Sequence, residues 1–105
     1  MPIDLTIREA QPKTKKRFTA IFRIHKRGKV IKITHFGQRN PKYGTYIDHK
    51  DKEIRSAYIA RHRVREKKFY KNPMRAATLS RFILWGDKTN LEDSIKDYKN
   101  KFNLS

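Results

Sequence analysis

Apolar and polar residues alternate along residues 18–24, and this alternation is typical of a half-buried β-strand. One face is apolar and holds Phe18, Ala20, Phe22 and Ile24. A second run, residues 30–36, is rich in β-branched residues, and the residues between the two runs include Gly28. The pattern therefore predicts an antiparallel hairpin over residues 18–36 with a short basic turn.

Two shorter segments extend the predicted sheet. Glycine, asparagine and proline between residues 37 and 44 mark a longer loop, and residues 45–47 after it predict a short third strand. Residues 3–7 also alternate, which predicts a further strand at the edge of the sheet. The apolar positions of that strand are Ile3, Leu5 and Ile7.

Three helices are predicted after the sheet. Asp48 can accept hydrogen bonds from the free amides of a first turn, so a first helix is predicted from Asp48 to about Lys68. Proline is tolerated at the first helical position, so Asn72-Pro73 predicts a second helix, and Gly86 predicts its end. Thr89-Asn90-Leu91-Glu92 fits a capping box that opens a third helix. The apolar stripe of this third helix is Leu91, Ile95, Tyr98 and Phe102.

The order of these elements and the length of the chain indicate the fold class. A small antiparallel sheet followed by three helices is an α+β arrangement. The 105 residues suffice for one domain, and 11% aromatic residues are more than a disordered basic tail would carry. We therefore expect residues 1–105 to form a single α+β domain, in which residues 1–17 could form a basic arm as the alternative to the edge strand.

The charge of the chain restricts its partners. The chain carries 27 Lys and Arg against 10 Asp and Glu, which gives a formal net charge of +17. No carboxylate occurs between Glu9 and Asp48, so this stretch repels itself unless an anion neutralises it. Solubility alone needs only about 2 to 8 units of charge. The excess favours a polyanionic partner, either nucleic-acid phosphates or the acidic faces of other proteins.

Two groups of cations are the candidate binding residues. In the first predicted helix an apolar stripe continues into cations, so one end packs while the other can contact phosphates. The alternative is a solvated amphipathic helix whose long side chains cover the sheet. The basic tip of the hairpin could enter a groove or a crevice between protein subunits. The candidate residues are Arg23, Lys26, Arg27, Lys29, Lys32, Arg61, Arg63, Arg65, Lys67 and Lys68.

Aromatic residues lie among these charges. Phe69 and Tyr70 follow the first predicted helix, and they could either stack on unpaired bases or pack within the fold. Tyr46 and Trp85 are predicted to lie in the core.

Most kinds of active site are excluded or disfavoured. The chain has no cysteine, which rules out disulfides, thiolate zinc sites and a cysteine nucleophile. Its 4 histidines lack metal-ligand spacing, and no glycine-rich phosphate loop is present. Asp48, Asp51 and Glu53 loosely suggest a metal-dependent nuclease, but a helix N-terminus accounts for the same acids. We expect no enzymatic activity, no metal, no cofactor and no small-molecule substrate.

The apolar runs are short. None approaches the roughly 18 residues of a membrane span, and the N-terminus lacks the apolar core of a signal peptide. We therefore expect neither a transmembrane segment nor secretion.

Several short motifs together carry a resemblance. They are Ile33-Thr34-His35-Phe36-Gly37-Gln38, Thr45-Tyr46-Ile47-Asp48-His49-Lys50-Asp51-Lys52, Tyr58-Ile59 with Arg61-His62, Asn72-Pro73-Met74, Leu79-Ser80-Arg81 and Ile83-Leu84-Trp85-Gly86. In this combination, over residues 33–104, the chain resembles a family of small basic proteins encoded by large nucleocytoplasmic DNA viruses of algae and protists. Residues 39–43 depart from the shorter, glycine-rich loop of that family.

The resemblance implies a viral setting and supplies no active site. Small basic proteins of such particles are expected beneath the capsid shell or on the packaged genome. Our first hypothesis is therefore a non-enzymatic virion structural protein, a minor capsid or inner-shell component whose partners are other capsid proteins. The second is a sequence-nonspecific nucleic-acid-binding protein that neutralises phosphates. The expected location is the virion, or the host cytoplasm or nucleus during assembly.

Overall fold

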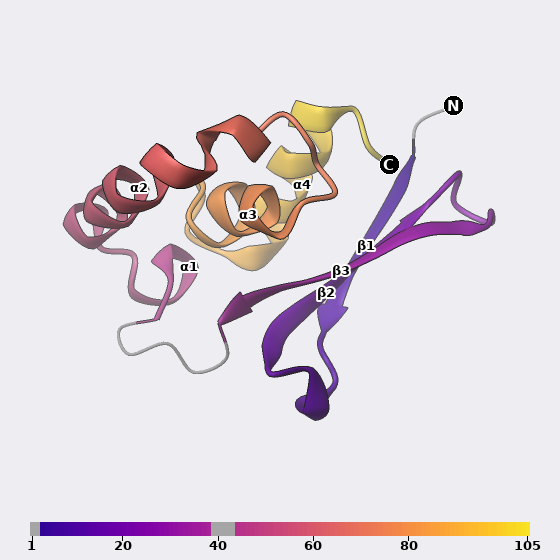
Figure 1. Cartoon of the computed structure of the whole chain (residues 1–105), viewed down its shortest axis with the longest axis horizontal. Helices are drawn as coiled ribbons and strands as arrows, with labels where there is room; N and C mark the ends of the chain where they lie inside the picture. The colour runs from indigo at the N-terminus through magenta and orange to yellow at the C-terminus, as the bar shows by residue number, and fades with distance from the viewer. Residues whose placement is uncertain (1–2, 39–43) are drawn as a thin grey trace.

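The predicted hairpin forms two of the three strands of an antiparallel sheet. The strands are β1 (Asp4–Glu9), β2 (Lys16–Arg23) and β3 (Val30–Gln38), and they lie in the order β1-β2-β3 (Figure 1). The computed structural model describes residues 3–38 and 44–105. Within these ranges the sheet is followed by helices, so the α+β fold is confirmed.

The register of the sheet places the apolar face of β2 toward the helices. Phe22 lies opposite Leu5 of β1, and Phe18 lies opposite Phe36 of β3. These four side chains are buried, as the alternation predicts. Ile24, the last residue of the predicted stripe, lies beyond the end of β2 and is 53% exposed. The buried stripe therefore ends at Phe22, whereas the sequence pattern continues to Ile24.

The N-terminal segment belongs to the sheet. β1 confirms the predicted edge strand, and a 3-10 turn, η1 (Pro12–Thr14), connects it to β2. Residues 3–17 therefore do not form a separate basic arm. The C-terminus lies beside this strand, because the Leu5 N–H donates to the Ser105 carbonyl at 2.9 Å and the Ser105 N–H donates to the Ile3 carbonyl at 3.0 Å.

The predicted third strand is wrong. Residues 45–47 lie at the start of a short helix, α1 (Tyr46–His49), and Thr45 is its N-cap. The Thr45 N–H donates to the Asp48 carboxylate at 2.8 Å, and the two residues form a capping box. Thr-Tyr-Ile has the composition of a strand, but the local capping bonds outweigh that preference. The loop predicted before this segment lies largely outside the described residues, in residues 39–43.

The long helix begins later than predicted. Asp48 belongs to α1, and Asp51 caps α2 (Lys52–Glu66) by accepting from the Glu53 N–H at 2.9 Å and the Ile54 N–H at 3.2 Å. α2 continues into a 3-10 turn, η2 (Lys67–Phe69), so its predicted end near Lys68 is close to the observed one.

The middle helical segment is shorter than predicted. It comprises α3 (Ala76–Leu79) and a π-helical turn, η3 (Ser80–Leu84), which ends before Gly86 as expected. The predicted start at Asn72 is too early, because the Asn72 side chain instead accepts from the Met74 N–H at 2.9 Å and closes a turn. Gly86 is required here, since a Cβ would clash with the Phe82 carbonyl.

The last helix, α4 (Leu91–Phe102), has the predicted apolar stripe, with Tyr98 almost fully buried. Its cap lies one residue later than predicted, at Asn90, whose side chain accepts from the Asp93 N–H at 2.9 Å. The Tyr98 hydroxyl donates to the Pro73 carbonyl and ties α4 to the turn before α3.

The helices gather on one side of the sheet (Figure 1). The core between them contains Tyr46 and Trp85, as predicted. The opposite face of the sheet is not covered by any described helix, and Ile31 and Ile33 on β3 are 44% and 52% exposed. The core residues are Leu5, Phe18, Ala20, Phe22, Phe36, Tyr46, Leu79, Ile83, Leu84, Trp85 and Tyr98.

Candidate polyanion-binding site

One cationic surface lies at the C-terminal end of α2. Ile54 and Tyr58 in the first half of the helix pack against the core, and the helical repeat continues this side of the helix through Arg61, Arg65 and Lys68. Two further cations lie on the other side of the same helical end. We call these five cations the helix cluster, and all of them are exposed. It consists of Arg61, Arg63, Arg65, Lys67 and Lys68.

A shallow groove runs through the helix cluster. Its volume is about 730 Å³, and Val64, Arg65, Lys67, Lys68 and Lys71 line it. Val64 is 88% exposed, so this face of α2 packs against nothing in the described chain. Sequence reasoning missed Lys71, although its position three residues after Lys68 was a signal that it belongs to the same surface.

A second cationic surface lies at the tip of the hairpin. The turn is closed by the Ile24 N–H, which donates to the Lys29 carbonyl at 3.0 Å, and by the Gly28 N–H, which donates to the His25 carbonyl at 2.8 Å. We call the cations around this turn the hairpin cluster; all are exposed except Arg23, which is half-buried. The cluster consists of Arg23, Lys26, Arg27, Lys29 and Lys32.

The structure does not bring the two clusters together. The longest axis of the molecule measures 40 Å, and the hairpin turn and α2 lie toward its opposite ends (Figure 1). The ten residues predicted as one set of partner contacts therefore form two separate surfaces.

Three carboxylates of the chain form ion pairs with cations outside the two clusters. Within residues 3–38 and 44–105 the ion pairs are Arg17–Asp48 at 2.7 Å, Arg55–Asp87 at 2.7 Å and Lys96–Glu92 at 3.9 Å. No member of either cluster takes part in one of these pairs. The charge of both clusters is therefore free to interact with an external anion.

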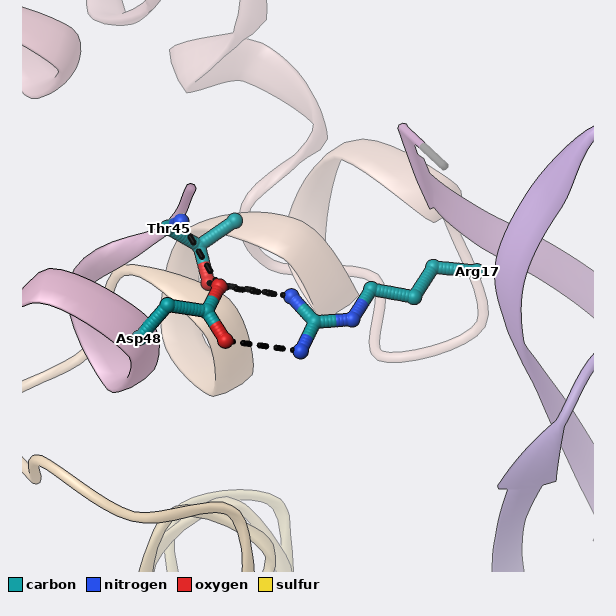
Figure 2. A network of polar contacts seen from close by, with 3 residues as sticks. All are labelled: Arg17, Thr45 and Asp48. Carbon is teal, nitrogen blue, oxygen red and sulfur yellow. Dashed lines mark hydrogen bonds and ion pairs between the residues drawn. The ribbon is translucent and has the colours of Figure 1, made fainter. Parts of the chain in front are cut away.

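Arg17 is a structural cation that sequence reasoning placed in the basic arm. Its guanidinium donates two parallel hydrogen bonds to Asp48, at 2.7 and 2.8 Å, beside the Thr45 cap (Figure 2). These hydrogen bonds hold the pKa of the Asp48 carboxyl well below its usual range and raise the pKa of Arg17. No local sequence signal connects the two residues, so only the fold shows that this cation is already neutralised.

The two candidate stacking residues make contacts within the protein. The Phe69 ring lies beneath the Lys68 ammonium at 5.2 Å and the Arg75 guanidinium at 4.6 Å. The Tyr70 ring packs edge-on against Phe82, with 5.5 Å between the ring centroids. Both residues are half-buried. Base stacking by them stays a prediction.

A column of aromatic rings, which sequence reasoning missed, supports the base of the helix cluster. Tyr58 stacks on Trp85 at 4.0 Å between centroids and on His62 at 3.9 Å. A cavity of about 460 Å³ beside the column is lined by residues that include Arg61 and Lys16. Spacing could have shown that Tyr58 and His62 share a helix face, but not that Trp85 completes the stack.

The described part of the chain holds neither a group of metal ligands nor a membrane-spanning helix. Within 3–38 and 44–105, no three His, Asp or Glu side chains are grouped so that they could hold a metal ion. No helix in this part of the chain has the length and apolar character needed to cross a membrane.

The hairpin cluster and the start of α2 lie in a segment that matches a known family. The profile of DUF5754, a family of unknown function, matches residues 9–62. The chain belongs to this family. The DUF5754 match includes the whole hairpin cluster and ends inside α2, so only Arg61 of the helix cluster lies within it. Neither a curated protein nor a solved structure matches the chain. The predicted likeness to viral proteins stays a prediction.

Proposed function

We propose that this member of DUF5754 is a non-enzymatic nucleic-acid-binding protein that contacts phosphates through the helix cluster. The observation that supports the proposal is a group of five exposed cations without an acidic partner at one end of α2. Glu66, which lies among them in the sequence, is half-buried and lines the cavity beside Tyr58 instead.

The helix dipole accounts for only part of this charge. Cations in the last turn of a helix are stabilised by the partial negative charge there, and Arg63 and Arg65 occupy that turn. Lys67, Lys68 and Lys71 lie beyond it, in and after η2. The dipole does not stabilise these three lysines, so their clustering favours a role in binding an external anion.

The chemistry of the side chains suits phosphate rather than base recognition. Arginine presents paired donors to phosphate oxygens, whereas lysine acts as a point charge. Binding would release counterions and would show little base preference. The groove that contains Val64 is shallow and basic, so it would follow a phosphate backbone rather than enclose a base.

A salt series with a 30-base-pair duplex of random sequence tests the proposal. The matched pair is Arg61→Glu/Arg65→Glu against the control Lys52→Glu/Lys88→Glu, which changes the net charge equally but lies outside the cluster. Each lost phosphate contact lowers the log–log slope by about 0.9. We expect the cluster variant to lose a slope of about 1.8 and affinity for every sequence. Equal affinities of the two variants near physiological salt would contradict the proposal.

A virion structural role is the second candidate, as a minor capsid or inner-shell protein in the virion or in the host cytoplasm or nucleus during assembly. The observation that favours it is the uncovered face of the sheet, where Ile31 and Ile33 are exposed next to the hairpin cluster. Exposed apolar side chains rimmed by charge are typical of protein contacts. Lys26→Glu/Arg27→Glu should then reduce incorporation into particles without unfolding the chain. Normal incorporation would count against this role.

A further inference from the structure

β3 is an edge strand with an unused row of backbone groups. It pairs with β2 on one side only. On its other side, the backbone groups of β3 make no hydrogen bond to the backbone of any other part of the described chain. An edge of this kind can accept an additional strand.

The opposite edge of the sheet differs. The C-terminal residue pairs with β1 through two hydrogen bonds, between Leu5 and Ser105 and between Ser105 and Ile3. The chain therefore covers part of one edge with its own terminus, whereas the outer backbone groups of β3 have no backbone partner in residues 3–38 and 44–105.

A cationic groove follows the open edge. It has a volume of about 730 Å³ and lies between β3 and the turn before α3. Lys32 and Arg75 line it and no carboxylate does. The Thr34 hydroxyl donates to the Met74 carbonyl at 2.7 Å and fixes the distance between the two walls. A segment with acidic side chains would match the positive charge of this groove.

The side chains of β3 alternate between two different environments. Ile31 and Ile33 lie on the open face of the sheet and are exposed, whereas Lys32 and Thr34 lie on the helix side, in register with Phe22 and Ala20. A strand added to β3 places its own side chains on the same two faces. Its apolar residues would then cover the isoleucines, and its acidic residues would face the lysine and the groove.

We propose that the edge of β3 binds an extended acidic segment of a partner protein as a fourth strand of the sheet. The segment alternates apolar and acidic residues, with the acidic side chains toward Lys32 and Arg75. This interface goes beyond the proposed nucleic-acid binding, because it lies on another element and recognises a protein backbone. A second copy of the chain is a poor occupant, since it would bring Lys32 against its own counterpart, and edge lysines disfavour such pairing.

A ten-residue peptide that alternates valine and glutamate is the probe for this site. Hydrogen exchange of the intact protein, followed residue by residue, should slow at alternate amides of β3 when the peptide is added. A peptide with lysine in place of glutamate and a peptide with proline in place of valine are the controls. Both should leave the exchange unchanged, because one carries the wrong charge and the other has lost the N–H of every second residue and cannot form a regular strand.

The protein variants separate this interface from the helix cluster. Lys32→Glu/Arg75→Glu should weaken peptide binding roughly tenfold or more, and Arg61→Glu/Arg65→Glu should leave it within twofold. Protection confined to α2, or equal binding of the proline peptide, would overturn the proposal, and these results do not depend on how well the variants fold.

Discussion

Arg17 and Asp48 lie 31 positions apart, and two hydrogen bonds of 2.7 and 2.8 Å join them. The pair connects the start of β2 to the capping box of α1. The side chains are 28% and 37% exposed, so the pair is only partly shielded from water. Its role is to hold the first helical turn against the sheet, and it takes one cation out of the positive surface.

This pair predicts a specific dependence of stability on pH. The pKa of Asp48 is lowered by folding, so its contribution is complete above the unfolded pKa of about 3.9 and is lost as the pH falls toward the folded pKa. Asp48→Asn should cost about 1 kcal/mol at pH 7, and the difference from the unaltered chain should shrink below about pH 4. Urea unfolding at pH 7 and pH 2.5 measures it. Asp97→Asn is the control, and a loss that is the same at both pH values would contradict the assignment.

Burial predicts opposite results for two apolar residues. Ile83 is fully buried in the core, whereas Val64 on α2 is 88% exposed. Ile83→Ala should lower the free energy of unfolding by about 2 to 5 kcal/mol, and Val64→Ala should change it by less than about 0.5 kcal/mol. Equilibrium unfolding in urea compares them directly. Similar losses would show that the core does not lie where the structure places it.

The stacked rings predict a fluorescence signal. Trp85 is the single tryptophan of the chain, and its ring lies within 4° of parallel to Tyr58. Tyr58→Ala should shift the emission of Trp85 to the red, because water reaches the indole, and should also remove about 1 kcal/mol of stacking energy. Tyr58→Phe keeps the ring and should keep the emission. An unshifted spectrum in the alanine variant would exclude this contact.

Tyr58 also predicts a late alkaline titration. Burial raises its pKa to about 12, compared with about 10 for a free tyrosine. Because the folded pKa is the higher one, its stabilising contribution is present below pH 10 and is lost between about pH 10 and 12. Spectrophotometric titration of the chain and of Tyr58→Phe isolates this step. A difference spectrum with a midpoint near 10 would contradict the burial of this hydroxyl.

The distance between the two clusters predicts that they act independently. Substitutions more than about 7 to 10 Å apart usually add within about 0.5 kcal/mol. Lys26→Glu/Arg27→Glu and Arg61→Glu/Arg65→Glu should therefore have additive effects on duplex affinity, with the larger effect from the helix cluster. Binding of all four combinations at one salt concentration tests this. A coupling above about 1 kcal/mol would mean that both clusters contact the same short stretch of the partner.

Sequence patterns predicted the elements whose signals are local. The alternation around Phe22 marks the buried face of a strand, and the apolar stripe through Tyr98 marks the buried face of a helix. The structure confirms both the hairpin and α4. The composition of residues 45–47 predicts a strand, but the capping bond between Thr45 and Asp48 prevails in the structure. Propensity alone does not show which of the two signals prevails.

The candidate site was predictable in composition but not in arrangement. The charge of each member of the helix cluster and its position in the helix predicted over residues 48–68 are enough to identify it. The separation of this cluster from Lys26 and Arg27 depends on how the hairpin packs against the helices. The same holds for the contact of Tyr58 with Trp85, which joins α2 to the end of η3.

The position of the two cationic surfaces at opposite ends has a consequence for mixtures with polyanions. A protein with one cationic surface at each end has two separate binding sites. A single molecule can then bind two polyanions that otherwise repel each other. This bridging is most effective when the number of cationic surfaces roughly equals the number of binding sites on the polyanions. When protein is in excess, each polyanion is coated separately, its charge is reversed and the coated particles repel again. Condensation therefore passes through a maximum as protein is added, whereas a protein with one cationic surface would only neutralise its partner.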